Sequence, residues 1–349
     1  MADPNGMPTE ENRNCIYATD DSVLPLHEAT LADDAGRASA LVAADSSALT
    51  RKNKAFRDAL HVACSRGSAD VADALLALQA DPNSRCGHQW TPLHLAASNN
   101  HERIVVALLE RRSAINAVDS SSCTPLWRAV QKSSSEAAMV LMDRNADVLI
   151  PDVDGETPLW QACEKGALSL VTVMLEREAD VNACDDDLHN TPLHQACYGG
   201  HVEAVVALLR MPGIQVNALN KKQSSPLHHA CMKGHIEVVD VLLRAGADAF
   251  LRNSSERSPG AEAENQREGE YRACAEACAN ACADAHGAYA CACVQRQRGA
   301  ISWAMFWGEG HVTDDVAISS TVSVCHHHDR YGKRRPLDWC CGNLDRIRP

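Results

Sequence analysis

A short motif recurs along this chain at a nearly constant interval of 33 or 34 residues. Its fullest copy is residues 191–194 (TPLH), followed by the glycine pair 199–200 and an apolar run at 202–209. Threonine is a good N-cap, and proline at the first helical position loses no hydrogen bond, so the motif predicts the start of a short helix. The apolar run predicts a second helix after the glycine turn. Each copy is therefore predicted to be one helix–turn–helix unit.

Seven copies share this register. The motif proline is held in turn by Pro25, Ala59, Pro92, Pro125, Pro158, Pro192 and Pro226, with alanine replacing proline once. One such unit is too thin to bury its own apolar face, so the units must stack against one another. The repeat therefore predicts an all-α solenoid of stacked helix–turn–helix units.

The motif, the second helices and turns such as 179–183 (ADVNA) resemble the ankyrin repeat family over about residues 22–253, two thirds of the chain. The resemblance implies an ankyrin-repeat solenoid with β-turn or hairpin fingers between units. It also implies a concave face built from those fingers and the exposed side of the first helices. The motif histidines are implied to make structural hydrogen bonds within and between turns. Trp127 and Trp160 replace that histidine in consecutive copies, and we expect them to stack on each other or to form an apolar concave patch.

Both ends of the chain depart from the repeat. Residues 1–21 contain few apolar side chains and are expected to be flexible. Pro259 is in phase, but Gly260 follows where leucine is needed, so the repeats are expected to end at 253. Residues 254–332 are predicted to be a disordered, low-complexity Ala/Cys-rich segment, and residues 333–349 resemble a truncated repeat remnant.

Composition limits the function classes. The net charge of −13 argues against a dedicated nucleic-acid binder, which would usually present a basic face. We identify no signal peptide, membrane-spanning stretch or catalytic signature such as a P-loop. The 16 cysteines are then expected to be reduced, in an intracellular protein, in the cytoplasm or the nucleus. We expect a monomeric non-enzyme with no cofactor, no bound nucleic acid and a protein partner.

The resemblance places the candidate partner-binding residues on fingers and first helices, centred on copies three to six. They are Arg85, His88, Trp90, Arg128, Lys132, Asp154, Glu156, Gln161, Lys165, Leu188, Asn190, Gln195, Tyr198, Lys222 and His229. Trp, Tyr and Arg are enriched at interface hot spots, so Trp90, Arg128 and Tyr198 are expected as anchors whose removal leaves folding intact. For Trp90, packing against a neighbouring turn is an equal alternative. Acidic fingers beside basic helix positions could orient a partner of mixed charge.

The predicted function is a scaffold or adaptor that binds a protein on its concave face. A first alternative is a substrate-recognition or regulatory subunit of a larger enzyme complex, such as a ubiquitin ligase. A second is a Cys/His metal or redox sensor through residues 274–328, where Cys274, Cys278, Cys282 and His286 would form one helical stripe. Zinc ligands usually come in close pairs from separate elements, so we predict no designed metal site.

Overall fold

The computed structural model describes residues 24–264, 273–280, 327–328 and 334–335. The chain divides into two compact parts, residues 1–297 and 298–349. The second part contains the antiparallel pair β1 (His327–His328) and β2 (Arg334–Arg335), with His327 opposite Arg335. The first part holds all the described helices, and its all-α repeat architecture is as predicted.

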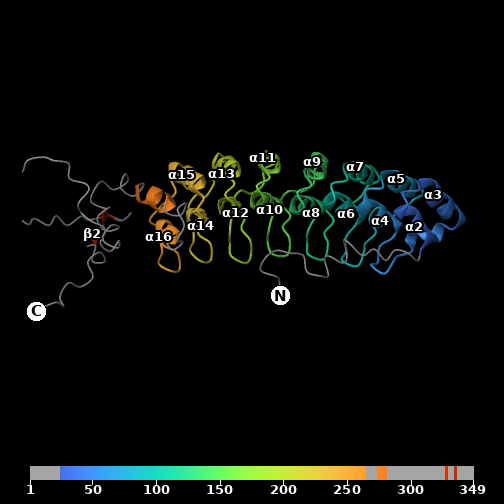
Figure 1. Cartoon of the computed structure of the whole chain (residues 1–349), viewed down its shortest axis with the longest axis horizontal. Helices are drawn as coiled ribbons and strands as arrows, with labels where there is room; N and C mark the ends of the chain where they lie inside the picture. Colours follow the sequence, from blue (N-terminus) through green and yellow to red (C-terminus); the bar gives the residue numbers. More distant parts are fainter. Residues whose placement is uncertain (1–23, 265–272, 281–326, 329–333, 336–349) are drawn as a thin grey trace, which may run out of the picture. The chain divides into compact units, whose positions relative to one another are not determined.

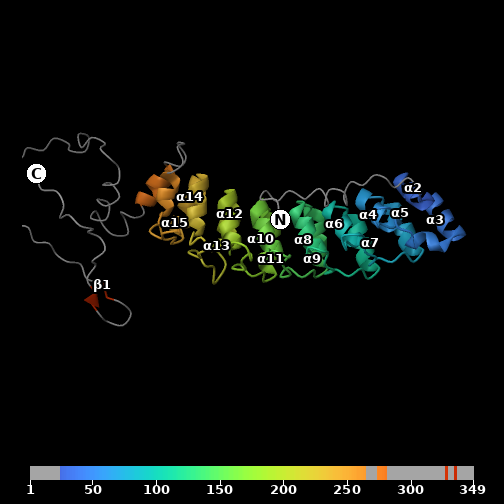
Figure 2. The same cartoon turned by 90° about the horizontal axis from the view of Figure 1, so that it is seen from below.

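Seven helix pairs follow the predicted register. They are α2 (Pro25–Leu31) and α3 (Ala35–Ala44), α4 (Ala59–Arg66) and α5 (Ala69–Ala77), α6 (Pro92–Ser98) and α7 (Glu102–Glu110), α8 (Pro125–Gln131) and α9 (Ser135–Asp143), α10 (Pro158–Lys165) and α11 (Leu168–Glu176), α12 (Pro192–Gly199) and α13 (Val202–Leu209), and α14 (Pro226–Lys233) and α15 (Ile236–Arg244). A 3₁₀ turn, η1 (Ser46–Thr50), follows α3. The first helices form one row and the second helices another, with the fingers projecting on one side (Figure 1). Figure 2 views the stack from that side.

We number the repeats 1 to 7 from the N-terminus, and each finger takes the number of the first helix that follows it. Fingers 3 to 8 are residues 80–90, 113–123, 146–156, 179–190, 212–224 and 247–257. Neighbouring fingers are joined by backbone hydrogen bonds, for example from Asp186 N to the Asp154 carbonyl at 2.8 Å and from Lys221 N to the Leu188 carbonyl at 2.8 Å. The fingers therefore form a continuous, mutually supported edge.

The motif histidine bridges to the next finger and, in repeats 3, 6 and 7, also completes a capping box with the Thr or Ser before its own helix. Thr191 and His194 form a capping box, in which the Thr191 backbone N–H donates to His194 Nδ1 at 3.1 Å. His194 Nε2 is then the protonated nitrogen, and it donates to the Ser224 carbonyl at 3.0 Å. Equivalent bridges join the other histidine repeats at 3.0 Å, from His27, His61, His94 and His228 to Arg57, Trp90, Cys123 and Arg257. This ladder ties every repeat to the next.

Tryptophan replaces histidine without breaking the ladder. Trp127 Nε1 donates to the Glu156 carbonyl at 2.9 Å, and Trp160 Nε1 donates to the Asn190 carbonyl at 3.0 Å. Both indoles are buried, at 3% and 7% exposure. The expected stack or apolar concave patch is therefore wrong, because each ring is committed to the following finger.

The core of the stack is aliphatic and small. Leucines such as Leu93, Leu159 and Leu193 are fully buried between repeats. Cys163, Cys197 and Cys231 are also fully buried, as small apolar side chains beside the motif alanine. Burial raises the pKa of the Cys163 and Cys197 thiols, which keeps them protonated and unreactive.

Two other series of hydrogen bonds join successive repeats on the side of the second helices. Both series are interrupted between repeats 4 and 5, where α9 packs beside α11. Asn116 Oδ1 accepts from Asp147 N at 3.0 Å, and Asn182 Oδ1 accepts from Gln215 N at 3.0 Å. The intervening position is Leu149, which is 52% exposed and provides no such bond. In the second series, His201 Nε2 of repeat 6 bonds the Glu164 carbonyl of repeat 5 at 3.0 Å. Ala167 holds the equivalent position in repeat 5, and its methyl group cannot make such a bond to repeat 4. This junction therefore relies on the indole ladder, on the fingers and on the ion pair between Arg177 Nη2, just after α11, and Asp143 Oδ1 of α9 at 3.1 Å.

The stack continues past residue 253, which corrects the predicted boundary. Helix α16 (Pro259–Glu264) follows finger 8, and residues 273–280 are helical. Cys274, Ala275 and Cys278 are buried at 0%, 4% and 2% exposure, the same i, i+1, i+4 spacing as Val238, Val239 and Leu242 of α15. Gly260 stands where the other repeats have leucine, and a Cβ there would lie 3.4 Å from Cys278 Cβ, so this position faces the helix at 273–280. Residues 254–264 and 273–280 thus form an eighth repeat. Residues 1–21 and most of 265–349 lie outside the described residues.

Candidate protein-binding surface

The structure divides the fifteen candidate residues by exposure. Arg85, Lys132, Asp154, Lys165, Tyr198 and Lys222 are exposed. His88, Glu156, Leu188, Gln195 and His229 are half-buried. Trp90, Arg128, Gln161 and Asn190 are buried. The expectation of a freely presented side chain is therefore wrong for the last four.

Six candidates converge on one groove. A cavity of about 530 Å³ lies between repeats 6, 7 and 8, and its lining includes Leu188, Asn190, Gln195, Tyr198, Lys222 and His229. Finger 6 and α12 supply the first four, while finger 7 and α14 supply the other two. The shared register brings together residues up to 41 positions apart in sequence, since Leu188 and His229 line the same wall.

An aromatic pair forms part of the groove. The rings of Tyr198 and His229 meet edge to face at 5.9 Å between centroids, and Tyr198 is 42% exposed. Lys233 Nζ lies 4.1 Å from the centroid of the Tyr198 ring, a cation–π contact. Burial, aided by neighbouring positive charge, lowers the pKa of His229 to about 4, so this imidazole is neutral at pH 7. The groove thus offers aromatic surface beside an ammonium group.

Two asparagines fix the fingers that carry these side chains. Asn220 Nδ2 donates to Asn190 Oδ1 at 2.9 Å, and Asn220 Oδ1 accepts from the backbone N–H groups of Lys222 and Ser224 at 2.9 Å. The Asn190 carbonyl also accepts the Trp160 indole. Asn190 is therefore a bracing residue of the groove, since its amide and carbonyl are already engaged.

Sequence reasoning missed the wall of the groove that repeat 8 supplies. Asn253, Ser254, Ser255 and Glu262 line this side. Asn253 Nδ2 donates to Glu262 Oε1 at 2.6 Å, and Arg257 Nη1 lies 3.3 Å from Glu262 Oε2. The available signal was the in-phase Pro259, which marks the start of α16.

Arg128 is the centre of a buried cluster. Its Nε and Nη2 contact Asp119 Oδ2 at 2.8 and 2.7 Å, and its Nη1 donates to Gln131 Oε1 at 3.0 Å. The guanidinium also lies 4.9 Å from the ring of Trp90 and 5.3 Å from that of Trp127. Trp90 is 3% exposed, and its carbonyl accepts the His61 bridge. Arg128 and Trp90 are therefore structural. This corrects the expected role of Arg128 as an anchor that folding does not need, and for Trp90 it favours the packing alternative over the anchoring one.

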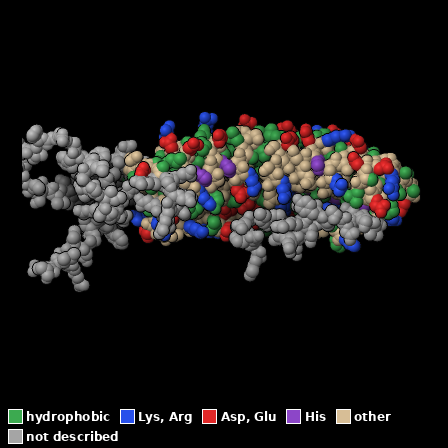
Figure 3. Space-filling view, in the orientation of Figure 1, with side chains coloured by type: hydrophobic (Ala, Val, Ile, Leu, Met, Phe, Trp, Pro, Cys, Tyr) green, Lys and Arg blue, Asp and Glu red, His purple; other side chains and the backbone are tan. Residues whose placement is uncertain are grey.

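Fingers 5 and 6 form an acidic surface. Burial raises the pKa of Glu156 to about 8, with further contributions from the charges of Asp152, Glu164, Asp154 and Asp185. Burial likewise raises the pKa of Asp152 to about 6. Acidic side chains gather below α10 and α12 in Figure 3. The raised values indicate carboxylates that lack sufficient compensating charge.

The remaining candidates lie beside these features. Arg85 Nη1 donates to the Val118 and Gln89 carbonyls at 2.8 and 3.3 Å, and so braces fingers 3 and 4. The His88 carbonyl accepts from Ser120 N at 3.1 Å. The buried Gln161 donates to Glu164 Oε2 at 2.6 Å, and Lys165 Nζ lies 3.2 Å from the same carboxylate. Lys132 follows α8 and is exposed.

The structure assigns the cysteine stripe to packing. Cys278 Sγ lies 3.5 Å from Cys231 Sγ in the core, and Cys274 is fully buried. Cys282 and His286 lie outside the described residues. Among the residues that are described, no group of three or more His, Cys, Asp or Glu is placed to hold a metal ion.

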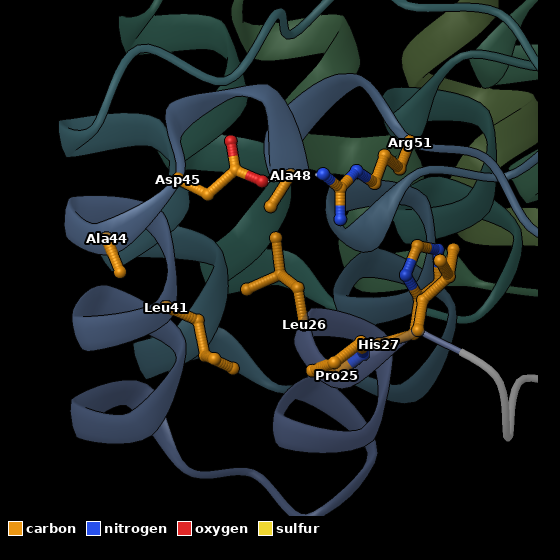
Figure 4. A pocket seen from close by; sticks show the side chains of 9 residues that line it. Pro25, Leu26, His27, Leu41, Ala44, Asp45, Ala48 and Arg51 are labelled. Carbon is orange, nitrogen blue, oxygen red and sulfur yellow. Dashed lines mark hydrogen bonds and ion pairs between the residues drawn. The ribbon is translucent and has the colours of Figure 1, made fainter.

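A second, smaller cavity of about 170 Å³ lies at the start of the stack. Leu26, Leu41, Ala44 and Ala48 give it an apolar lining, with Asp45 and Arg51 at its edge (Figure 4). These two charged groups are already paired at 2.6 Å. This cavity shares no lining residue with the groove of repeats 6 to 8.

Within the described part of the chain, no helix has both the length and the apolar character that crossing a membrane requires.

The register, the fingers and the paired helices define a solenoid of stacked helix–turn–helix repeats. The family model for ankyrin repeats (3 copies) matches residues 26–119, 111–185 and 179–253, and the chain belongs to the ankyrin repeat family. The crystal structure of the human ASB11 ankyrin repeat domain is similar, with a TM-score of 0.58 and 25% identity. The similarity covers 63% of this chain and 98% of that domain. No curated protein sequence matches the chain.

Proposed function

We propose that this protein is a non-catalytic scaffold that holds a partner protein against the concave side of repeats 3 to 8. Ankyrin repeats are generally protein-interaction modules. The groove of repeats 6 to 8 carries the proposal, because six candidate residues from two fingers and two first helices line one cavity. Rigid scaffolds commonly recognise partners with such exposed finger and helix side chains. Tyr198 is the proposed central anchor.

The groove is also held in place by hydrogen bonds between repeats. The ladder from each motif His or Trp to the next finger, with the finger-to-finger bonds, holds the groove before a partner arrives. A preformed surface loses little conformational entropy on binding, so more of the contact energy is retained as affinity. The mechanism is therefore rigid presentation of side chains, with no chemical step.

The test is a comparative capture with the full-length protein. Wild type, Tyr198→Ala and the control Glu203→Ala, which alters an exposed residue of α13, are immobilised and the captured proteins are quantified by mass spectrometry. We expect a partner that is lost at least about tenfold with Tyr198→Ala and retained with Glu203→Ala, since a central aromatic anchor contributes about 2 kcal/mol or more. Equal capture by all three proteins would show that the groove is not the binding site.

A further inference from the structure

The groove of repeats 6 to 8 carries positive charge that no described carboxylate pairs with. Lys222 on finger 7 lines the groove, and Lys233 at the end of α14 lies over the ring of the groove residue Tyr198. The charges of both lysines act on His229. In the described part of the chain, neither lysine has a carboxylate within ion-pair distance. The nearby Glu262 is already bonded to Asn253 and Arg257. The groove therefore favours a ligand that brings a carboxylate.

The neighbouring fingers have the opposite character. Asp154, Asp186 and Asp187 are exposed on fingers 5 and 6, next to Glu156 and its raised pKa. Lys221 Nζ donates to the Asp186 carbonyl at 2.5 Å, so this lysine marks the boundary between the two regions. The charge changes sign along the stack within one or two repeats, because the exposed aspartates lie on fingers 5 and 6 and Lys222 lies on finger 7. Figure 3 shows acidic and basic side chains close together on this face. A basic side chain would be attracted to the acidic fingers.

We propose that the occupant is an extended segment of a partner protein that carries an acidic side chain for Lys222 and Lys233 and a basic side chain for the acidic fingers. Packed helices lie about 8–10 Å apart and an extended chain advances about 3.3 Å per residue, so one to two repeats correspond to roughly three to six residues. This spacing sets the separation of the acidic and the basic residue along the segment. The inference rests on the proposed function, because it needs the concave side to hold a partner.

Polyanions are disfavoured as occupants. A nucleic acid would place phosphates against the lysines, but its next phosphates would then meet the acidic fingers 5 and 6. The chain as a whole carries a net charge of −13, which adds long-range repulsion. A segment of mixed charge satisfies both regions at once.

The test uses peptide display against the full-length protein. A library of random 16-residue peptides is selected on wild type, on the charge-reversed Lys222→Glu/Lys233→Glu variant and on Tyr198→Ala, with folding of each checked by circular dichroism. We expect wild-type binders to share an acidic and a basic residue three to six positions apart. Their affinity should fall at least tenfold on the charge-reversed variant, and less on a Lys222→Gln/Lys233→Gln variant.

Three results separate the possible failures. Peptides that need Tyr198 but share no such charge pair would overturn this inference and leave the proposed function standing. An absence of any Tyr198-dependent peptide would count against both. A lysine-dependent affinity for a 12-nucleotide single-stranded oligonucleotide that exceeds that of the selected peptides would also overturn the inference, in favour of a polyanion.

Discussion

The indole of Trp160 donates to the carbonyl oxygen of Asn190 at 3.0 Å, the same bond that His194 provides one repeat later to Ser224. The two side chains are interchangeable donors in the ladder, but they differ in one property. An imidazole can gain a proton, whereas an indole cannot. The ladder is therefore sensitive to pH in some repeats and insensitive in others.

The stack should lose stability in mild acid. Burial lowers the pKa of His94 to about 4 and that of His194 to about 3, while an unfolded histidine titrates near 6.5. A lowered folded pKa means that the stabilisation is complete above about pH 6.5 and is lost as the pH falls towards the folded value. We expect the free energy of unfolding, measured by urea titration, to fall between pH 7 and pH 5 by up to about 1.4 kcal/mol per histidine per pH unit.

The variant Trp160→His provides the matched comparison. It should be less stable than wild type at pH 7, because a smaller ring leaves a cavity, and its loss between pH 7 and pH 5 should be steeper. A slope identical to that of wild type would show that the ladder does not set the acid sensitivity.

Glu156 should give the stability of the fold the opposite pH dependence to that of the histidines, because its pKa is raised. Burial and the neighbouring carboxylates raise its pKa to about 8, so the folded state holds this proton more tightly than the unfolded state does. Its contribution to stability is therefore fully present below about pH 4.5, falls as the pH rises, and is lost by about pH 8. Glu156→Gln should raise the thermal midpoint at pH 9 and change it less at pH 6. Asp187→Asn, at an exposed site on finger 6, is the control, and equal effects of the two variants would contradict the prediction.

Substitution of Arg128 should lower the free energy of unfolding strongly, whereas substitution of Tyr198 should leave it nearly unchanged. Arg128→Ala leaves the carboxylate of Asp119 buried without its partner, which typically costs about 3–5 kcal/mol. Tyr198→Ala removes an exposed ring and should change the free energy of unfolding by about 1 kcal/mol or less. Chemical denaturation of both variants measures the difference. If Arg128→Ala unfolds at the wild-type midpoint, the ion pair with Asp119 is not structural.

The helices of repeats 1 to 7 could be predicted because the constant interval of the motif fixes the position of many residues in each repeat. The spacing from Pro92 to Pro226 locates each first helix, and the ladder carbonyl always precedes the cap residue of the next repeat. The eighth repeat was missed because its connection is longer: Val238 follows Pro226 by 12 positions, whereas Cys274 follows Pro259 by 15. Cys274 and Cys278, the described members of the apparent stripe of metal ligands, are therefore core residues of a second helix.

The candidate site was only partly predictable, for a physical reason. The repeat register places Arg128 and Tyr198 on the same side of their helices, but it says nothing about long side chains that fold back. Arg128 is buried because Asp119, nine residues earlier on finger 4, pairs with it beside two indoles. Tyr198 stays accessible at 42% exposure, and the charged group over its ring is the flexible Lys233. Such pairings depend on neighbouring repeats and not on the motif.

The junction between repeats 4 and 5 should be the easiest place to open on the side of the second helices. Leu149 interrupts the asparagine ladder, and Ala167 interrupts the histidine ladder at the same junction. In Leu149→Asn, the new amide is placed to accept from Asp180 N, 31 positions later, as Asn116 accepts from Asp147 N. We expect a gain of about 0.5–1.5 kcal/mol in unfolding free energy, the usual net value of one such hydrogen bond.

Hydrogen exchange can locate the effect of this substitution. Amides of α9 and α11 should exchange faster than those of α13 in wild type, and Leu149→Asn should slow them selectively. The reverse substitution, Asn182→Leu, removes the bonds that Asn182 makes to Gln215 and Gly213 and should speed exchange at the next junction instead. Uniform protection across α9, α11 and α13 in wild type would show that the two interrupted ladders do not weaken this junction.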